Sequence, residues 1–128
     1  MLNKFFLPNR EGNLSDKISE MLLKVGADFI QLGETIESRE NNLRLVASAW
    51  NMACHEKSLR EKHIKDAISV YSKLNKSDKS KAKAYESNLR QLIKQKIALF
   101  PFEKVQIVNV RISQENGQEK VWVSSIKM

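Results

Sequence analysis

The C-terminal stretch from Val105 to Met128 reads VQIVNVRISQENGQEKVWVSSIKM, and the hydrophobic period of the chain changes here. From about Asn13 to Phe100 the apolar residues recur at helical spacing, whereas beyond Pro101 β-branched residues surround a single Asn116-Gly117 pair. Asn-Gly is a strong signal for a two-residue type I′ turn. The sequence therefore predicts an α+β, mainly α, fold in which a four-helix body precedes a C-terminal antiparallel β-hairpin.

The predicted turn also fixes the register of the hairpin. It places Arg111 opposite Trp122 on one face and an apolar ladder on the other face. Because an isolated hairpin is only marginally stable in water, we expect the ladder to pack on the helices. The predicted ladder consists of Val108, Val110, Ile112, Val121 and Val123.

The second face of the hairpin is the predicted protein interface, with Ile107, Arg111, Trp122 and Ile126 as its residues. A single helical body covers only one face of a hairpin, and an uncovered face or strand edge invites pairing with another chain. We therefore expect contact with another protein, most simply a second copy in a two-fold homodimer. The alternative is that the segment Phe5-Phe6-Leu7 folds over this face within the same chain.

Four amphipathic helices are expected in the body, and Trp50 is expected to lie buried between the first two. Short connections between such helices favour antiparallel neighbours and a bundle. The sequence predicts a single domain, 1–128, made of an N-terminal segment (1–12), a helical bundle (13–100) and a β-hairpin (104–127). The helices are predicted at about Ser15–Ile36, at Arg39–Cys54 after an N-cap at Ser38, after a Ser58/Glu61 capping box, and from about residue 77 to Phe100.

Composition predicts a globular protein of the cytoplasm. The 128 residues are 41% hydrophobic and 29% charged, which is ordinary for a chain that buries a core. One cysteine, Cys54, excludes an intramolecular disulfide and favours a reducing compartment. The apolar cluster near the N-terminus is too short for a signal peptide, and no run reaches the length of a membrane span.

Charge is distributed unevenly along the chain. The net charge is +7, but the residues up to Glu56 carry −2 and those from Lys57 onward carry +9. The fourth helix places Lys79, Lys83, Arg90 and Lys94 along one face. Such a basic stripe is typical of a phosphate-backbone binder, so sequence-nonspecific nucleic-acid binding is the alternative function. A solvated helix face explains the same lysines without any ligand.

No catalytic or cofactor site is predicted. Cys54 and His55 are adjacent and would point to different sides of their helix, so together with His63 they do not form a zinc-type ligand set. The four glycines are scattered and form no phosphate-binding loop. A solvated helix end explains the acidic group Glu34, Glu37 and Glu40.

These observations predict a non-enzymatic module that contacts another macromolecule, without metal, cofactor or membrane. Protein–protein contact or self-association through the hairpin is the leading interpretation. Nucleic-acid binding is the second. An enzyme of unrecognised type and a bundle that binds a small ligand or lipid are further alternatives.

Overall fold

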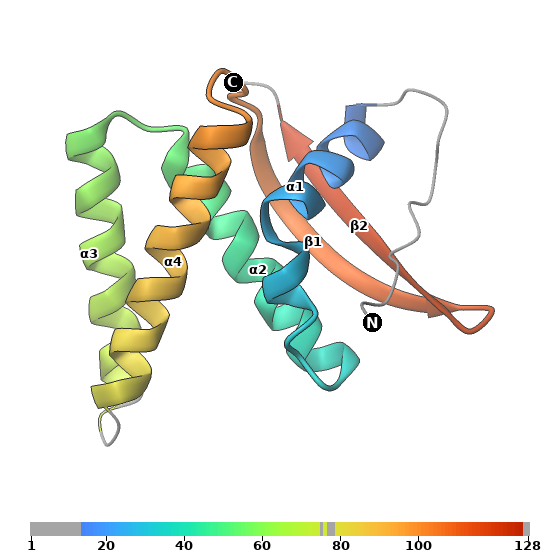
Figure 1. The fold of residues 1–128 in the computed structure, drawn as a ribbon, viewed down its shortest axis with the longest axis horizontal. Coiled ribbons are helices and arrows are strands. Elements are labelled where there is room, and N and C mark those ends of the chain that lie inside the picture. Colours follow the sequence, from blue (N-terminus) through green and yellow to red (C-terminus); the bar gives the residue numbers. More distant parts are fainter. Residues whose placement is uncertain (1–13, 75, 77–78, 127–128) are drawn as a thin grey trace.

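The structure is a computed structural model that describes residues 14–74, 76 and 79–126. It confirms the predicted class, because four helices are followed by a two-stranded antiparallel sheet (Figure 1). Within the described residues, no helix combines the length and apolarity that a membrane crossing requires. The elements are α1 (Leu14–Ile30), α2 (Ile36–Ala53), α3 (Lys57–Leu74), α4 (Lys79–Leu99), β1 (Gln106–Glu115) and β2 (Gln118–Ile126).

The boundary between the first two helices differs from the prediction. α1 ends at Ile30, and Ile36 opens α2 instead of closing α1. The N-cap of α2 is Thr35, whose Oγ1 accepts a hydrogen bond from the Ser38 N–H at 3.0 Å. Ser38 Oγ in turn accepts from the Thr35 N–H at 2.9 Å, which completes a capping box. The predicted cap at Ser38 is therefore wrong, because Ser38 is the third residue of the helix and reaches back to the true cap.

The start of α3 also differs. The helix begins at Lys57, so Ser58 lies in its first turn and is not the cap. The Ser58 hydroxyl donates to the Glu56 carboxylate at 2.7 Å. Glu61, the other half of the predicted capping box, pairs with Arg90 of α4.

The helices and the hairpin share one hydrophobic core. α1 and α2 pack on the inner face of the curved hairpin, α4 packs against α2 and α1, and α3 lies at the far side against α4 and α2 (Figure 1). Both strands and α1, α2 and α4 contribute several buried apolar side chains, whereas α3 contributes only Ile64 among those described. α1 and α2 approach closely at Gly26, where a Cβ would lie 2.5 Å from Val46 Cγ2.

The turn of the hairpin is as predicted. Asn116 and Gly117 have φ angles of 52° and 76°, the left-handed values that a type I′ turn requires at both central positions. The predicted pairing is confirmed from the turn as far as Asn109 opposite Ser124. Beyond this pair a β-bulge shifts the register, so that Ile107 lies opposite Ser125 and Gln106 opposite Ile126.

Candidate interaction surface

The β-bulge corrects the predicted faces of the hairpin. Val108 is the extra residue, and an extra residue reverses the alternation of side chains beyond it. Ile107 therefore turns inward and is only 6% exposed, whereas Val108 is 62% exposed. The assignment of Ile107 to the protein interface is wrong, and so is that of Val108 to the buried ladder. No residue pattern in the sequence signals the bulge.

The remaining predicted interface residues lie on the face of the hairpin turned away from the helices, here called the outer face. The Arg111 guanidinium carbon lies 4.8 Å from the centre of the Trp122 ring, as the register predicted. Trp122 Nε1 also donates to Ser113 Oγ at 2.7 Å, so the indole is held flat along the strands and is half-buried. Ile126 is 54% exposed at the end of β2.

Side chains of α2 cover the free edge of β1. Asn51 donates through Nδ2 to the Ile107 carbonyl and accepts from the Ile107 N–H through Oδ1, both at 2.8 Å. Further along the strand, Glu40 Oε2 accepts from the Ile112 N–H at 2.8 Å. Asn109 Oδ1 accepts from the Val110 N–H at 3.0 Å. The outward amides of Ile107, Val110 and Ile112 are thus all satisfied by side chains.

In the part of the chain that the structure describes, the outer edge of β2 has no such cover. In a hairpin with this register, the peptide groups of Glu119, Val121, Val123 and Ser125 point away from β1. Among the described residues, no hydrogen bond from outside the hairpin reaches these groups. The side chains of Val121 and Val123 are buried against the helices, so the strand is held firmly while its edge stays open.

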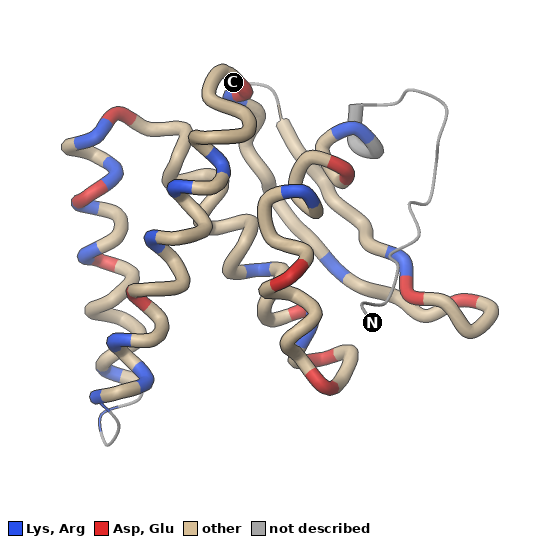
Figure 2. Tube along the Cα trace, in the orientation of Figure 1, with Lys and Arg blue, Asp and Glu red and all other residues tan. Residues whose placement is uncertain are grey.

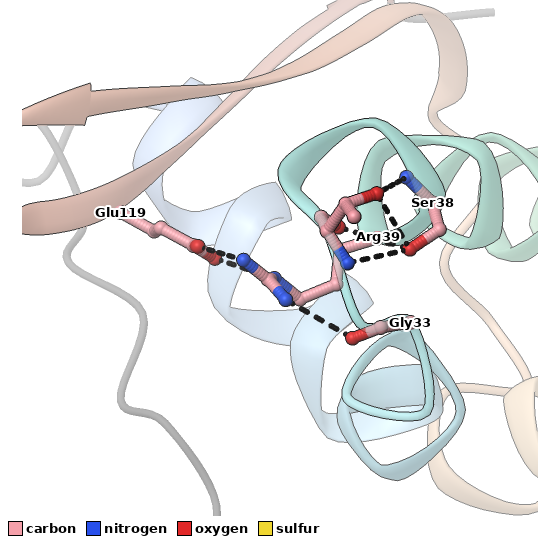
Figure 3. A network of polar contacts seen from close by, with 5 residues as sticks. Gly33, Ser38, Arg39 and Glu119 are labelled. Atoms are coloured by element: carbon pink, nitrogen blue, oxygen red, sulfur yellow. Dashed lines mark hydrogen bonds and ion pairs between the residues drawn. The ribbon is translucent and has the colours of Figure 1, made fainter.

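The charges of β2 are confined to its turn end and are paired there. Glu119 accepts from Arg39 Nε at 2.9 Å and makes a second contact with Nη2 of the same guanidinium (Figure 3). Arg39 Nη1 also donates to the Gly33 carbonyl at 3.0 Å, which ties the strand to the connection between α1 and α2. Lys120 pairs with Glu115 at 3.3 Å. From Val121 to Ile126 the strand carries no charged side chain.

A second anchor holds the beginning of β1. The Trp50 side chain is completely buried, as predicted, and its Nε1 donates to the Val105 carbonyl at 2.8 Å. The buried Lys96 lies with its Nζ 4.9 Å from the centre of the Trp50 ring and donates to the Glu103 carbonyl at 2.6 Å. Burial lowers the pKa of Lys96 and raises that of the neighbouring Cys54 thiol.

The basic stripe on α4 is less uniform than predicted. Arg90 binds Glu61 of α3 at 3.0 Å and Glu86 of its own helix at 2.9 Å. The hydrogen bond between them raises the pKa of Arg90 and lowers that of Glu61. Arg90 is therefore engaged in a network, whereas Lys79, Lys83 and Lys94 are exposed. Lysines gather at the end of the α3–α4 pair that lies far from the hairpin (Figure 2).

The titratable groups singled out in the sequence do not assemble into a catalytic centre. Cys54 Sγ faces the Glu103 carbonyl at 3.6 Å, whereas the His55 ring lies next to that of His63, so the adjacent residues diverge as expected. Within the described residues, no three His, Cys, Asp or Glu side chains gather where a metal ion could bind. Glu40 is not simply exposed to solvent at a helix end, because its carboxylate accepts from the Ile112 N–H of β1 and pairs with Arg44.

Sequence reasoning missed that Asn51 and Glu40 of α2 bind the edge of β1. The adjacent Trp50 and Asn51 were the available signal, since a polar amide beside a buried indole needs partners of its own. The partner of Trp50 is Val105, 55 positions further along the chain, and that of Asn51 is Ile107, 56 positions further along. Periodicity within a helix does not identify such distant partners. Comparisons with protein-family models, with curated protein sequences and with solved structures found no significant match to this chain.

Proposed function

We propose that this protein is a non-enzymatic interaction module that self-associates through the outer edge of β2. Two copies would pair their β2 strands antiparallel about a two-fold axis, which extends the two-stranded sheet to four strands. The observation that carries the proposal is the difference between the two edges. Side chains of α2 and Asn109 engage three outward N–H groups of β1, whereas among the described residues no hydrogen bond from outside the hairpin reaches the outward peptide groups of β2.

The composition of β2 supports the proposal. Sheet proteins commonly protect an exposed edge with charged residues, proline or a bulge. β2 carries its two charges beside the turn, both are already paired, and the bulge lies on β1. A second copy is the simplest occupant, because two identical uncharged edges meet without like-charge repulsion.

Amide hydrogen exchange tests the pairing directly. In the proposed dimer, the outward N–H groups of Val121 and Val123 exchange slowly and their protection increases with protein concentration. The amides of Trp122 and Ser124 bond to β1 within each copy and stay protected at every concentration. Fast, concentration-independent exchange of the Val121 and Val123 amides in a protein that sediments as a monomer would overturn the proposal.

Two substitutions test whether the dimer interface is the edge of β2 or the outer face of the hairpin. Ser124→Lys places a charge on β2 near its copy across the two-fold axis, and we expect it to convert the dimer to a monomer. Val108→Lys, on the exposed bulge of β1, is the matched control and should leave the dimer intact. If both lysine substitutions dissociate the dimer, the interface is the whole outer face of the hairpin. In that case Trp122→Glu should dissociate the dimer as well. Helical circular dichroism should be unchanged in all three variants.

The N-terminal segment is the competing occupant. Phe5-Phe6-Leu7 lies outside the described residues. Removal of residues 1–12 should leave the dimer unchanged if β2 pairs with a second copy. A protein that is monomeric with the segment and dimeric without it would show that the segment occupies the edge, and would contradict self-association of the full chain.

Nucleic-acid binding is the second candidate, and the exposed lysines at the far end of α3 and α4 favour it. The engagement of Arg90 with two carboxylates reduces the predicted stripe to Lys79, Lys83 and Lys94. Binding through these residues would be weak and independent of sequence. Loss of duplex DNA binding in the triple Lys→Glu variant, with the dimer retained, would support this candidate as a separate activity.

A further inference from the structure

A pair of histidines lies on the side of α2 that faces α3. His55 belongs to the connection after α2, and His63 lies in the second turn of α3. Their ring centres are 4.9 Å apart, with 34° between the ring planes. Both rings border a hollow of about 270 Å³ that Met52, Asn51 and Ser48 also line. Within the part of the chain that the structure describes, no hydrogen bond engages a ring nitrogen of either histidine.

The separation of the rings suits a shared metal ion. An imidazole nitrogen binds a transition metal at about 2 Å, and two imidazoles on one ion at a tetrahedral angle have ring centres about 5 Å apart. The observed 4.9 Å agrees with this value. Both rings are half-exposed, so an ion can reach them from solvent.

The other groups around the hollow select the kind of ion. The side chains that line the hollow include no carboxylate or thiol: the available donors are two imidazoles, the Met52 thioether and the Ser48 hydroxyl, while the amide of Asn51 is engaged with Ile107. Arg60 lies next to the pair, since its Nη2 donates to the His55 carbonyl at 3.0 Å. A guanidinium beside the site and the lack of a carboxylate in its lining disfavour a divalent ion. Thioether and imidazole ligands favour monovalent copper.

We propose that His55, His63 and Met52 form a binding site for a monovalent copper ion. The imidazoles supply two nitrogen ligands and the thioether supplies the third donor. The site lies between α2 and α3, and the residues that bind the ion are not those that pair β2, so it does not depend on the proposed self-association. Binding would fix the connection between α2 and α3.

The experiment is a titration of the full-length protein with Cu(I) under anaerobic, reducing conditions, in competition with a chromogenic Cu(I) chelator. We expect one ion per chain and shifts of both imidazole signals in NMR spectra. His63→Gln should weaken binding by a factor of about ten or more. Met52→Leu, which preserves size and apolarity, should weaken Cu(I) binding, because the soft thioether ligand is lost.

Two controls make the outcome decisive. Cys54→Ser should bind Cu(I) like the parent protein, because the thiol faces the Glu103 carbonyl on another side of the chain. Circular dichroism and the ring contacts of Tyr71 and Tyr85 in NMR spectra report whether α3 and α4 remain packed in each variant. Undetectable Cu(I) binding, binding that survives His63→Gln in the folded protein, or binding that disappears in Cys54→Ser would overturn the proposal.

Discussion

Asn51 is a single side chain that takes the place of a neighbouring strand. Its amide both donates to and accepts from the backbone of Ile107, as a peptide group of a third strand would. Asn51→Ala leaves a donor and an acceptor of the backbone without partners, and we expect a loss of about 1–3 kcal/mol in the free energy of unfolding. Urea denaturation followed by circular dichroism measures it.

Asn51→Asp is the matched control for this residue. The carboxylate still accepts from the Ile107 N–H, but it cannot donate to the Ile107 carbonyl and instead repels it. We expect Asn51→Asp to be destabilised too, and to recover stability when acid protonates the new carboxyl group. A variant as stable as the parent at neutral pH would contradict the role assigned to the amide.

Trp50 combines packing with a hydrogen bond. Trp50→Ala removes the largest fully buried side chain among those described and should cost about 3–5 kcal/mol, which is a large share of the stability of an ordinary domain. Trp50→Phe retains much of the ring and loses only the bond to the Val105 carbonyl, so it should remain folded. Iodide quenching supplies an independent check: in Trp122→Phe, the remaining indole fluorescence should be protected from the quencher.

The buried pair of Lys96 and Cys54 makes stability depend on alkaline pH in two opposing ways. The pKa of Lys96 is lowered from 10.5 in the folded protein, so the unfolded chain binds more protons and stability rises with pH over the range up to about 10.5. The pKa of Cys54 is raised from 9.0, so the folded protein binds more protons and stability falls as pH rises above about 9.

Two variants distinguish the contributions of Lys96 and Cys54 to the pH dependence of stability. In Cys54→Ala only the Lys96 effect remains, and the free energy of unfolding relative to the parent should increase above about pH 9. Lys96→Met should show the opposite trend, because the stabilising deprotonation of the amine is lost. Urea denaturation at several pH values between 7.5 and 10 gives both curves, and parallel curves for all three proteins would refute the assignment.

At the scale of the element, the hairpin is joined to the helices at both ends. Arg39 and Glu119 hold the turn end, with side chains only 11% and 12% exposed. Glu119→Ala leaves the Arg39 guanidinium nearly buried without its carboxylate, and we expect a loss of up to about 3 kcal/mol. Glu115→Ala breaks the more exposed pair with Lys120 and should cost about 0–1 kcal/mol. Equal effects in thermal denaturation would contradict this difference.

The same element shows what the sequence could and could not predict. Asn116-Gly117 determines the turn, and the turn determines the pairs nearest to it, including Arg111 with Trp122. The prediction is wrong beyond Asn109, because the bulge at Val108 has no local residue signal, and the residue beside it, Ile107, is bound by Asn51 from a distant helix. Three of the four predicted interface residues therefore lie on the outer face, and the fourth lies in the core.

The helices, too, could be predicted only in part from the sequence. Periodicity predicted the existence of each helix, while Thr35 took the capping role that was assigned to Ser38. Both residues are good caps, so residue type alone does not decide between them. In the structure Arg39 Nη1 also donates to the Gly33 carbonyl in the connection before α2. The basic stripe on α4 was predicted from spacing alone, and spacing does not reveal that Glu61 of α3 binds Arg90.

At the scale of the whole molecule, the proposed dimer and nucleic-acid binding respond differently to salt. Pairing of β2 edges uses neutral peptide groups, so the dimer should persist between 50 and 200 mM salt. Contacts of Lys79, Lys83 and Lys94 with three phosphates would weaken roughly 40-fold over the same fourfold range. Sedimentation and fluorescence anisotropy with labelled duplex DNA measure the two effects. A dimer that dissociates with salt would refute the edge-pairing geometry.

The attachment of β1 to α2 has a consequence for the order in which the chain folds. A ribosome releases α1 and α2, with Trp50, well before residues 105–126, which supply the other side of their core. Until those residues emerge, the nascent helices have an uncovered apolar side and Asn51 has no strand to bind. This core therefore closes only after β2 has been synthesised, and we expect the helices to be open to chaperone binding during that interval.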